Sequence, residues 1–206
     1  MPIPFELERM KEMRNAKVNR QTGETAIDLA FTIDGDGIST IDTGIGFFDH
    51  MLTLMTKHGL FNLDVKCDGD LEVDQHHSVE DIGIALGQAF HKALGDKKGI
   101  TRYATVTTPM DEALSTISLD ISGRAYFVYH VEDLKDKVGN FDTELVEEFF
   151  QAFVSNAKVT LHINLAYGKN THHMIESIFK GFGRVLDQAT QKNPRIKGVP
   201  STKGSL

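Results

Sequence analysis

The chain has 206 residues, enough for one large domain or two small halves, and its 40% hydrophobic and 25% charged content is normal for a folded protein. The formal charge of −7 argues against nucleic-acid binding, because that function needs clustered Lys and Arg. Cys67 is the only cysteine, which excludes intramolecular disulfides and thiolate zinc sites. No stretch approaches the ~20 apolar residues of a membrane span, and the N-terminal segment lacks the apolar core of a signal peptide. We therefore expect a cytoplasmic protein that binds neither nucleic acid nor membranes.

The first predicted element is a strand within residues 24–35, where apolar residues recur at period two and share one face. A helix from about Gly46 to His58 follows, opened by a glycine-containing turn at 43–46. After a short strand at 63–65, a second helix begins with His76-His77-x-x-Glu80. Its apolar residues have the i, i+3, i+4, i+7 spacing of one buried face; they are Val79, Ile82, Leu86, Ala89, Phe90 and Ala93.

The same order of elements recurs after the turn at 95–99. A strand is predicted within 112–123, a helix at about 143–156, a strand at 160–163, and a helix that begins with His172-His173-x-x-Glu176. A shift of 96 superimposes the two HHxxE motifs, and it also aligns Gly87 with Gly183. A repeat of this length predicts the architecture before any single element is assigned.

The fold predicted from these patterns is α+β, a tandem duplication in which each half is a sheet with helices on one face and starts with an antiparallel hairpin. No Pro- or Ser-rich linker separates the halves, so we expect one domain over residues 1–206. Its two repeats are predicted at about 5–97 and 98–192, followed by a C-terminal tail at 193–206.

The two histidine doublets predict metal binding. Successive helix residues point ~100° apart, so His76 and His77 are not expected to bind the same ion, whereas His76 and Glu80 lie on one face. One doublet therefore indicates two ions, with the equivalent pair being His172 and Glu176. If a pseudo-twofold axis relates the two halves, the remaining histidines, His77 and His173, would each reach across to the ion bound by the pair of the other half. Nitrogen and oxygen donors without sulfur suit Mn, Fe or Zn, and favour six-coordinate Mn(II) over tetrahedral zinc.

A further ligand is expected from the other helix of each half. His50 is the candidate in the first half, and its equivalent in the second half is Glu148 after a loop correction of two residues. Glu147 is the alternative, on a different face of that helix.

Five segments together resemble the signatures of the imidazoleglycerol-phosphate dehydratase family. They are TGIGFFDHML at 43–52, DQHHSVED at 74–81, SGR at 122–124, NTHHMIE at 170–176 and PSTKG at 200–204. The resemblance implies a duplicated fold like the second domain of ribosomal protein S5, two Mn²⁺ ions per site, and a homo-oligomer of twenty-four subunits. It also implies one ion held by His50, His77, His172 and Glu176, and the other by His76, Glu80, His173 and Glu148. Many relatives carry His where this chain has Glu148.

The resemblance further implies a hydro-lyase of histidine biosynthesis that removes water from D-erythro-imidazole-glycerol phosphate to give imidazole-acetol phosphate. Glu24, at a strand start, is expected to contact the substrate and to be the base that removes a carbon-bound proton. Other substrate contacts are expected from side chains that include cations suited to phosphate; they are His58, Arg102, Arg124, Lys180, Ser201 and Lys203.

Two other functions compete with this interpretation. A metal-binding structural or storage protein would also use histidine and carboxylate ligands, but the strands and the basic residues argue against it. A two-metal phosphohydrolase would bind phosphate on its metals, yet the aspartate-rich ligation expected there is missing.

Overall fold

The computed structural model describes residues 13–206 of the chain, so residues 5–12 at the start of the first predicted repeat lie outside the described residues. In the first half the elements are β1 (Asn15–Gln21), β2 (Thr25–Thr32), β3 (Ile38–Asp42), α2 (Gly46–Gly59), β4 (Asn62–Gly69) and α3 (His76–Leu94). In the second half they are β5 (Tyr103–Met110), β6 (Ala113–Asp120), β7 (Tyr126–His130), β8 (Lys137–Val138), β9 (Phe141–Asp142), α4 (Leu145–Ala157), β10 (Thr160–Tyr167) and α5 (Thr171–Thr190).

The two four-stranded sheets have the same topology. Their strand orders are β1-β2-β4-β3 and β5-β6-β10-β7. In each sheet the first three strands are antiparallel, and the strand at the far edge is parallel to its neighbour. The predicted tandem duplication, including an antiparallel hairpin at the start of each half, is therefore confirmed.

Alternation of apolar and polar residues sets the inner face of the first sheet. The register places Ile27 opposite Cys67, Leu29 opposite Val65, and Phe31 opposite Leu63, and all six side chains are buried; these pairs join β2 to β4. Their sequence neighbours point outward, as a period of two requires. The predicted apolar stripe of α3 is also buried along its whole length.

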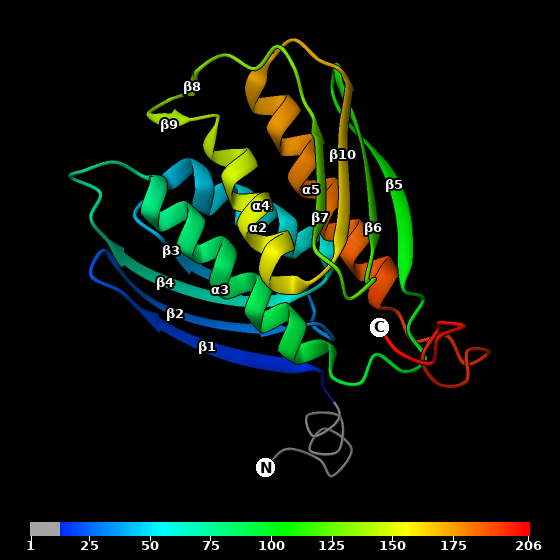
Figure 1. Ribbon diagram of the computed structural model, residues 1–206. Coiled ribbons are helices and arrows are strands. Elements are labelled where there is room, and N and C mark those ends of the chain that lie inside the picture. The colour runs from blue at the N-terminus through cyan, green and yellow to red at the C-terminus, as the bar shows by residue number, and fades with distance from the viewer. Residues whose placement is uncertain (1–12) are drawn as a thin grey trace.

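The helices fill the space between the two sheets (Figure 1). α3 packs on β1 and β2, α5 packs on β5 and β6, and the halves meet where α3 contacts α4 and α2 contacts α5. Gly87 and Gly183 lie at these two contacts. A Cβ atom at Gly87 would lie 2.6 Å from the Phe153 carbonyl oxygen, and one at Gly183 would collide with the Met55 carbonyl oxygen. The glycines shared by the two repeats thus allow the helices of opposite halves to cross closely.

Six of the strands have no predicted residue range; they are β1 and β5, which the predicted hairpins imply, and β3, β7, β8 and β9. β3 and β7 are edge strands whose side chains are at most half-buried, so neither shows a clear alternation of buried and exposed residues. β8 and β9, of two residues each, form a small hairpin within the connection between β7 and α4. None of the helices in the described part of the chain has both the length and the apolar character that a bilayer-spanning helix needs.

Candidate metal centre and substrate-binding residues

The N-terminal parts of α2 and α5 bring three predicted metal ligands together. His50 Nε2 lies 3.9 Å from Glu176 Oε2, and His172 Nε2 lies 3.3 Å from the same oxygen. One donor atom from each of these residues falls within 4.8 Å of the others. Asn170 caps α5 by accepting a hydrogen bond from the His172 backbone N–H, which fixes the start of this helix. Two imidazoles and one carboxylate, without sulfur, fit a divalent ion such as Mn²⁺, Fe²⁺ or Zn²⁺.

Glu176 is the buried member of this cluster, with only 9% of its side chain exposed. Burial alone raises the pKa of its carboxyl, but the Lys180 ammonium, 2.5 Å away, and the nearby histidines outweigh burial, so the pKa is lowered. The carboxylate form is thereby favoured, which is the form that binds cations.

A second histidine–carboxylate pair lies at the start of α3. His76 Nε2 is 3.7 Å from Glu80 Oε2, one helical turn later, and both side chains are about half exposed. This is the arrangement expected for residues at i and i+4 on one helix face.

Glu148 is the structural equivalent of His50. α2 and α4 both end in a left-handed residue, Leu60 and Lys158, and the offset of 98 between these two caps aligns His50 with Glu148. The HHxxE helices are offset by 96, because the connection from β10 to α5 is shorter than that from β4 to α3. Glu148 is half-buried, whereas the alternative, Glu147, is exposed.

The other histidine of each doublet contacts a carboxylate through its Nδ1 atom. His77 Nδ1 lies 3.0 Å from Asp70 Oδ2, and His173 Nδ1 lies 2.8 Å from Glu112 Oε2. These hydrogen bonds, more than any other influence, raise the pKa of both imidazoles. The other oxygen of Glu112, Oε1, accepts hydrogen bonds from the backbone N–H groups of Lys169 and Asn170. The pKa of Glu112 falls to about 2, chiefly because of the hydrogen bond with His173. Neither carboxylate was singled out as a site residue from the sequence.

One chain does not gather the full predicted ligand sets. Among residues 13–206, His50, His172 and Glu176 form the one group of three metal-binding side chains within 4.8 Å of one another. His77 instead faces Asp70 and Glu24, and the first turns of α3 and α5 lie apart, at the left and at the top of Figure 1.

Glu24 lies immediately before β2, next to a predicted ligand. Its Oε1 atom is 3.7 Å from His77 Nε2, and the side chain is 54% exposed. The backbone N–H of Glu24 donates to Thr22 Oγ1, which holds the turn between β1 and β2. The carboxylate is thus held near His77 and open to solvent.

The predicted substrate-binding residues fall into two groups. His58 and Lys180 lie near Glu176, and burial, followed by the charges of Lys180 and Arg184, lowers the pKa of His58. The second group is at the other end of α5, where the Arg102 backbone N–H donates to the Ala189 carbonyl.

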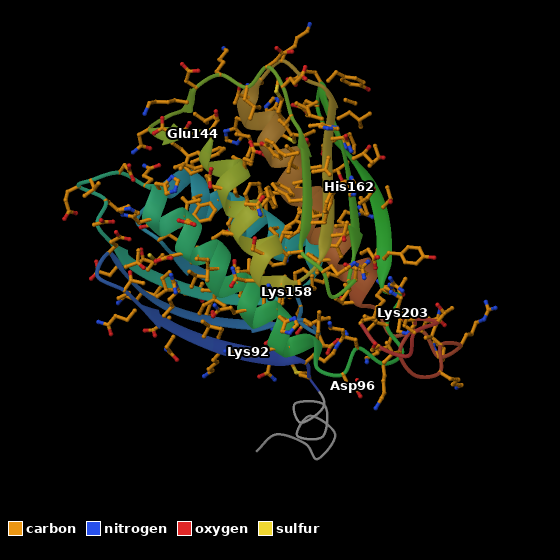
Figure 2. The ribbon with its side chains drawn as sticks, in the orientation of Figure 1. Lys92, Asp96, Glu144, Lys158, His162 and Lys203 are labelled. Carbon is orange, nitrogen blue, oxygen red and sulfur yellow. The ribbon has the colours of Figure 1, made fainter. Side chains whose placement is uncertain are left out.

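The tail closes over this second group. The Arg102 guanidinium forms two hydrogen bonds with Asp120 and donates a third, of 2.9 Å, to the Pro200 carbonyl. Ser201 and Lys203 follow directly in the tail, and Figure 2 shows Lys203 on the opposite side of the molecule from Glu144 at the start of α4. Arg124 belongs to the 122–124 turn, where its Nη1 donates to the Ser122 carbonyl.

The two ends of α5 are far apart. At 1.5 Å per residue, the distance along the helix from His172 to Ala189 is roughly 25 Å. The three-residue cluster and the tail residues therefore do not meet within one chain.

A basic hollow beside His172 was not predicted. A cavity of about 360 Å³ is lined by Lys135, Lys137, Lys169, Asn170 and His172, among others. The lysines come from the β8 region and from the loop before α5, which are distant in sequence, so no local pattern could have indicated their proximity.

Comparison with known proteins gives one family. A sequence model described as imidazoleglycerol-phosphate dehydratase matches residues 43–186. The imidazoleglycerol-phosphate dehydratase of Oceanobacillus iheyensis is 69% identical over 194 residues, covering 94% of this chain and 100% of the relative. That of Acetivibrio thermocellus is 60% identical, covering 94% of this chain and 99% of the relative.

Solved structures agree with the sequence matches. The imidazoleglycerol-phosphate dehydratase from Staphylococcus aureus has a TM-score of 0.79 and 45% identity, covering 87% of this chain and 99% of that one. The enzyme from Pyrococcus furiosus also has a TM-score of 0.79, with 34% identity, covering 92% of this chain and 100% of that one.

Proposed function

The chain belongs to the imidazoleglycerol-phosphate dehydratase family, and from this membership we propose that it uses two Mn²⁺ ions per site to convert D-erythro-imidazole-glycerol phosphate into imidazole-acetol phosphate. The family assigns the chain to the metal-dependent carbon–oxygen lyases of histidine biosynthesis, which act on a small-molecule substrate. The observation that carries the proposal is the group formed by His50, His172 and Glu176 at the start of α5. No observation favours a storage protein or a phosphohydrolase.

We propose that one ion is held by His50, His77, His172 and Glu176, and the other by His76, Glu80, Glu148 and His173. The grouping of three of these residues, the one-face geometry of His76 and Glu80, and the equivalence of Glu148 to His50 support these sets. When bound, such ions supply Lewis acidity and a template for a nitrogen heterocycle.

Glu24 is proposed as the base that accepts the carbon-bound proton of the substrate. A general base must be placed within reach of the proton and must be able to accept it. The Glu24 carboxylate is half exposed and lies 3.7 Å from His77, so a substrate held at the ion bound by His77 would be close to it.

The phosphate group of the substrate is proposed to contact Arg102, Arg124, Ser201 and Lys203, with His58 and Lys180 nearer to the metal ligands. Guanidinium groups offer phosphate a planar pair of donors, and lysine offers a point charge. Because the tail and the metal-binding cluster lie at opposite ends of α5, we propose that a site combines residues of neighbouring subunits. The homo-oligomer of twenty-four subunits remains part of this proposal, as does a cytoplasmic location.

The test is to incubate the Mn-loaded protein with D-erythro-imidazole-glycerol phosphate and to follow imidazole-acetol phosphate. Turnover is expected with Mn²⁺ and is expected to disappear after chelation. Absence of turnover with Mn²⁺, Fe²⁺ and Zn²⁺ would refute the activity, and release of inorganic phosphate would indicate a hydrolase instead.

A variant tests the role of Glu24 in the same assay. Glu24→Gln keeps the size of the side chain but cannot take up a proton, so we expect a loss of turnover of at least about 100-fold, the usual contribution of a general base, with metal and substrate binding retained. Loss of bound metal in Glu24→Gln, measured by metal analysis, would show that Glu24 supports the metal site instead.

A further inference from the structure

Two of the proposed ligands, His77 and His173, each have a carboxylate from outside the ligand sets at their Nδ1 atom. Asp70 lies at Nδ1 of His77, at 3.0 and 3.2 Å, and Glu112 lies at Nδ1 of His173, at 2.8 Å. We propose that Asp70 and Glu112 are positioning residues that keep the proton of each imidazole on Nδ1 and leave Nε2 free to bind the metal. This inference rests on the proposed function in requiring that His77 and His173 bind a divalent ion, but it does not require the dehydratase reaction.

The chemistry of imidazole explains why such a partner matters. A neutral imidazole carries one N–H, and the nitrogen without hydrogen is the one that can bind a metal. A carboxylate only accepts hydrogen bonds, so a carboxylate at Nδ1 selects the tautomer with its hydrogen on Nδ1. A partner of this kind also orients the ring before the metal arrives.

Glu112 is held in place by the backbone. Its Oε1 atom accepts hydrogen bonds from the backbone N–H groups of Lys169 and Asn170, at 3.1 and 2.7 Å. Its Oε2 atom is therefore the oxygen directed at His173. The position facing the backbone must be an oxygen, because both partners there are donors.

Asp70 is held differently. Both of its carboxylate oxygens lie within 3.2 Å of His77 Nδ1, and within residues 13–206 no other hydrogen bond to this carboxylate is present. Its backbone N–H donates to the Glu24 carbonyl at 3.1 Å, which ties the loop to the start of β2. The side chain itself is free to exchange its two oxygens by rotation.

This difference makes the two amide substitutions behave differently. In Glu112→Gln the amide oxygen must face the two backbone N–H groups, so the NH₂ group faces His173 and donates to Nδ1. The imidazole hydrogen then moves to Nε2, and that nitrogen can no longer bind the metal. In Asp70→Asn the amide can rotate and present its oxygen to His77 Nδ1, which preserves the working tautomer.

The experiment is a calorimetric titration of the metal-free, full-length protein with Mn²⁺ alone, combined with thermal unfolding of each variant. We expect Glu112→Gln to weaken Mn²⁺ binding on the order of 10- to 100-fold, the usual effect of removing a partner of a ligating histidine. Glu112→Ala removes the carboxylate without imposing the wrong tautomer, so it is expected to weaken binding less, although it loses the backbone hydrogen bonds and lowers the unfolding temperature more. Asp70→Asn is expected to bind nearly as tightly as the wild type.

The order of the two Glu112 variants is decisive. A purely structural role predicts that Mn²⁺ affinity follows thermal stability, with Glu112→Ala weaker than Glu112→Gln, and this order would overturn the inference. Equal affinity of Glu112→Gln and the wild type would also overturn it while leaving the proposed function intact. A wild-type protein that binds no Mn²⁺ would overturn both.

Matched controls lie next to each position. Asp111→Asn changes a carboxylate whose nearest oxygen is 4.0 Å from His173 Nδ1, and Glu72→Gln changes an exposed carboxylate two residues after Asp70. Both are expected to bind Mn²⁺ like the wild type. A loss in Asp111→Asn equal to that in Glu112→Gln would show that general charge, and not the hydrogen bond to Nδ1, governs binding.

Discussion

Glu24 and Glu112 occupy equivalent positions before β2 and β6, yet their carboxylates contact different atoms. Glu112 is bonded to Nδ1 of His173 and to two backbone N–H groups, so both of its oxygens are occupied. Glu24 instead faces Nε2 of His77 at 3.7 Å and is half exposed, while Asp70 takes the position at Nδ1. The duplication has therefore diverged at the residue scale, with one glutamate open to solvent beside the proposed metal site and the other enclosed by hydrogen bonds.

Arg14 and Asp34 form the most extensive ion pair near the start of the described chain. Arg14 donates from its backbone N–H, Nε and Nη2 to the two Asp34 oxygens, and its Nη1 donates to the Thr190 carbonyl at the end of α5. The hydrogen bonds with Arg14 hold the pKa of Asp34 below its ordinary value, against a partial opposing effect of burial. This pair links the first sheet to the last helix.

The lowered pKa predicts how stability depends on pH. A carboxyl whose folded pKa is depressed contributes stability above its unfolded pKa of about 3.9, and that contribution is lost as pH falls through the folded pKa. Asp34→Asn should thus be less stable than the wild type at pH 7, and the gap should narrow as the pH falls below about 4 and close once the pH has passed the lowered pKa of Asp34 in the folded protein. Solvent screening at this partly exposed pair keeps the effect modest.

Urea unfolding at pH 7 and at pH 3 measures this gap. The control is Glu132→Gln, which changes an exposed carboxylate in a loop. It should leave the unfolding midpoint unchanged at both pH values. An equal deficit of Asp34→Asn at pH 7 and pH 3 would contradict the assigned role of the charge.

At the scale of elements, the close crossing of α3 and α4 depends on Gly87. A Cβ atom there would lie 2.6 Å from the Phe153 carbonyl oxygen and 2.9 Å from the Asn156 Cβ. Alanine is the better helix former by about 1 kcal/mol in isolation, but the contact forces the two helices apart. We expect Gly87→Ala to lower the free energy of unfolding by about 1–3 kcal/mol, the usual cost of overpacking a core.

Gly46→Ala is the matched control for this prediction. Gly46 is the first residue of α2, and a Cβ there would meet no atom within 4 Å. Its substitution should be neutral or stabilising by up to about 1 kcal/mol in the same denaturant titration. If Gly87→Ala unfolds at the same denaturant concentration as the wild type, α3 and α4 do not cross closely at Gly87.

At the scale of the whole molecule, the positions of the metal-binding cluster and the tail predict complementation between subunits. His50→Ala removes a proposed ligand, and Lys203→Ala removes a proposed phosphate contact; each should abolish most activity alone. The two proteins are then dissociated, mixed in equal amounts and reassembled. If one chain supplies His50 and another supplies Lys203, each of these residues is intact in half of the sites, so both are intact in about one quarter of the sites.

A pair of variants within one cluster provides the control. His50 and Glu176 belong to the same chain's cluster, so mixing His50→Ala with Glu176→Gln should restore no activity. Assays before and after reassembly distinguish the cases. Failure of the His50→Ala and Lys203→Ala mixture to regain activity would mean that each chain completes its own site after a rearrangement of the tail.

Much of the fold followed from local periodicity. The period of two in residues 24–35 and the helical spacing of Val79, Ile82 and Leu86 identify buried faces directly, because burial imposes the repeat of the backbone on the sequence. The edge strands β3 and β7 lack a fully buried face and left no such signal. The shift of 96 between the HHxxE motifs revealed the duplication before any contact was known.

What the sequence by itself determined is therefore the duplicated α+β architecture, the family, and the pairing of His76 with Glu80 and of His172 with Glu176 on single helix faces. Only the tertiary structure decided which carboxylates face His77 and His173, and through which nitrogen. Asp70 lies in the loop just before α3 and Glu112 lies 61 residues before His173, and no period in the sequence encodes either hydrogen bond. It also decided that the cluster around Glu176 and the tail residue Lys203 lie at opposite ends of α5. The sequence lists both sets of residues, but the length and rigidity of a helix keep them apart.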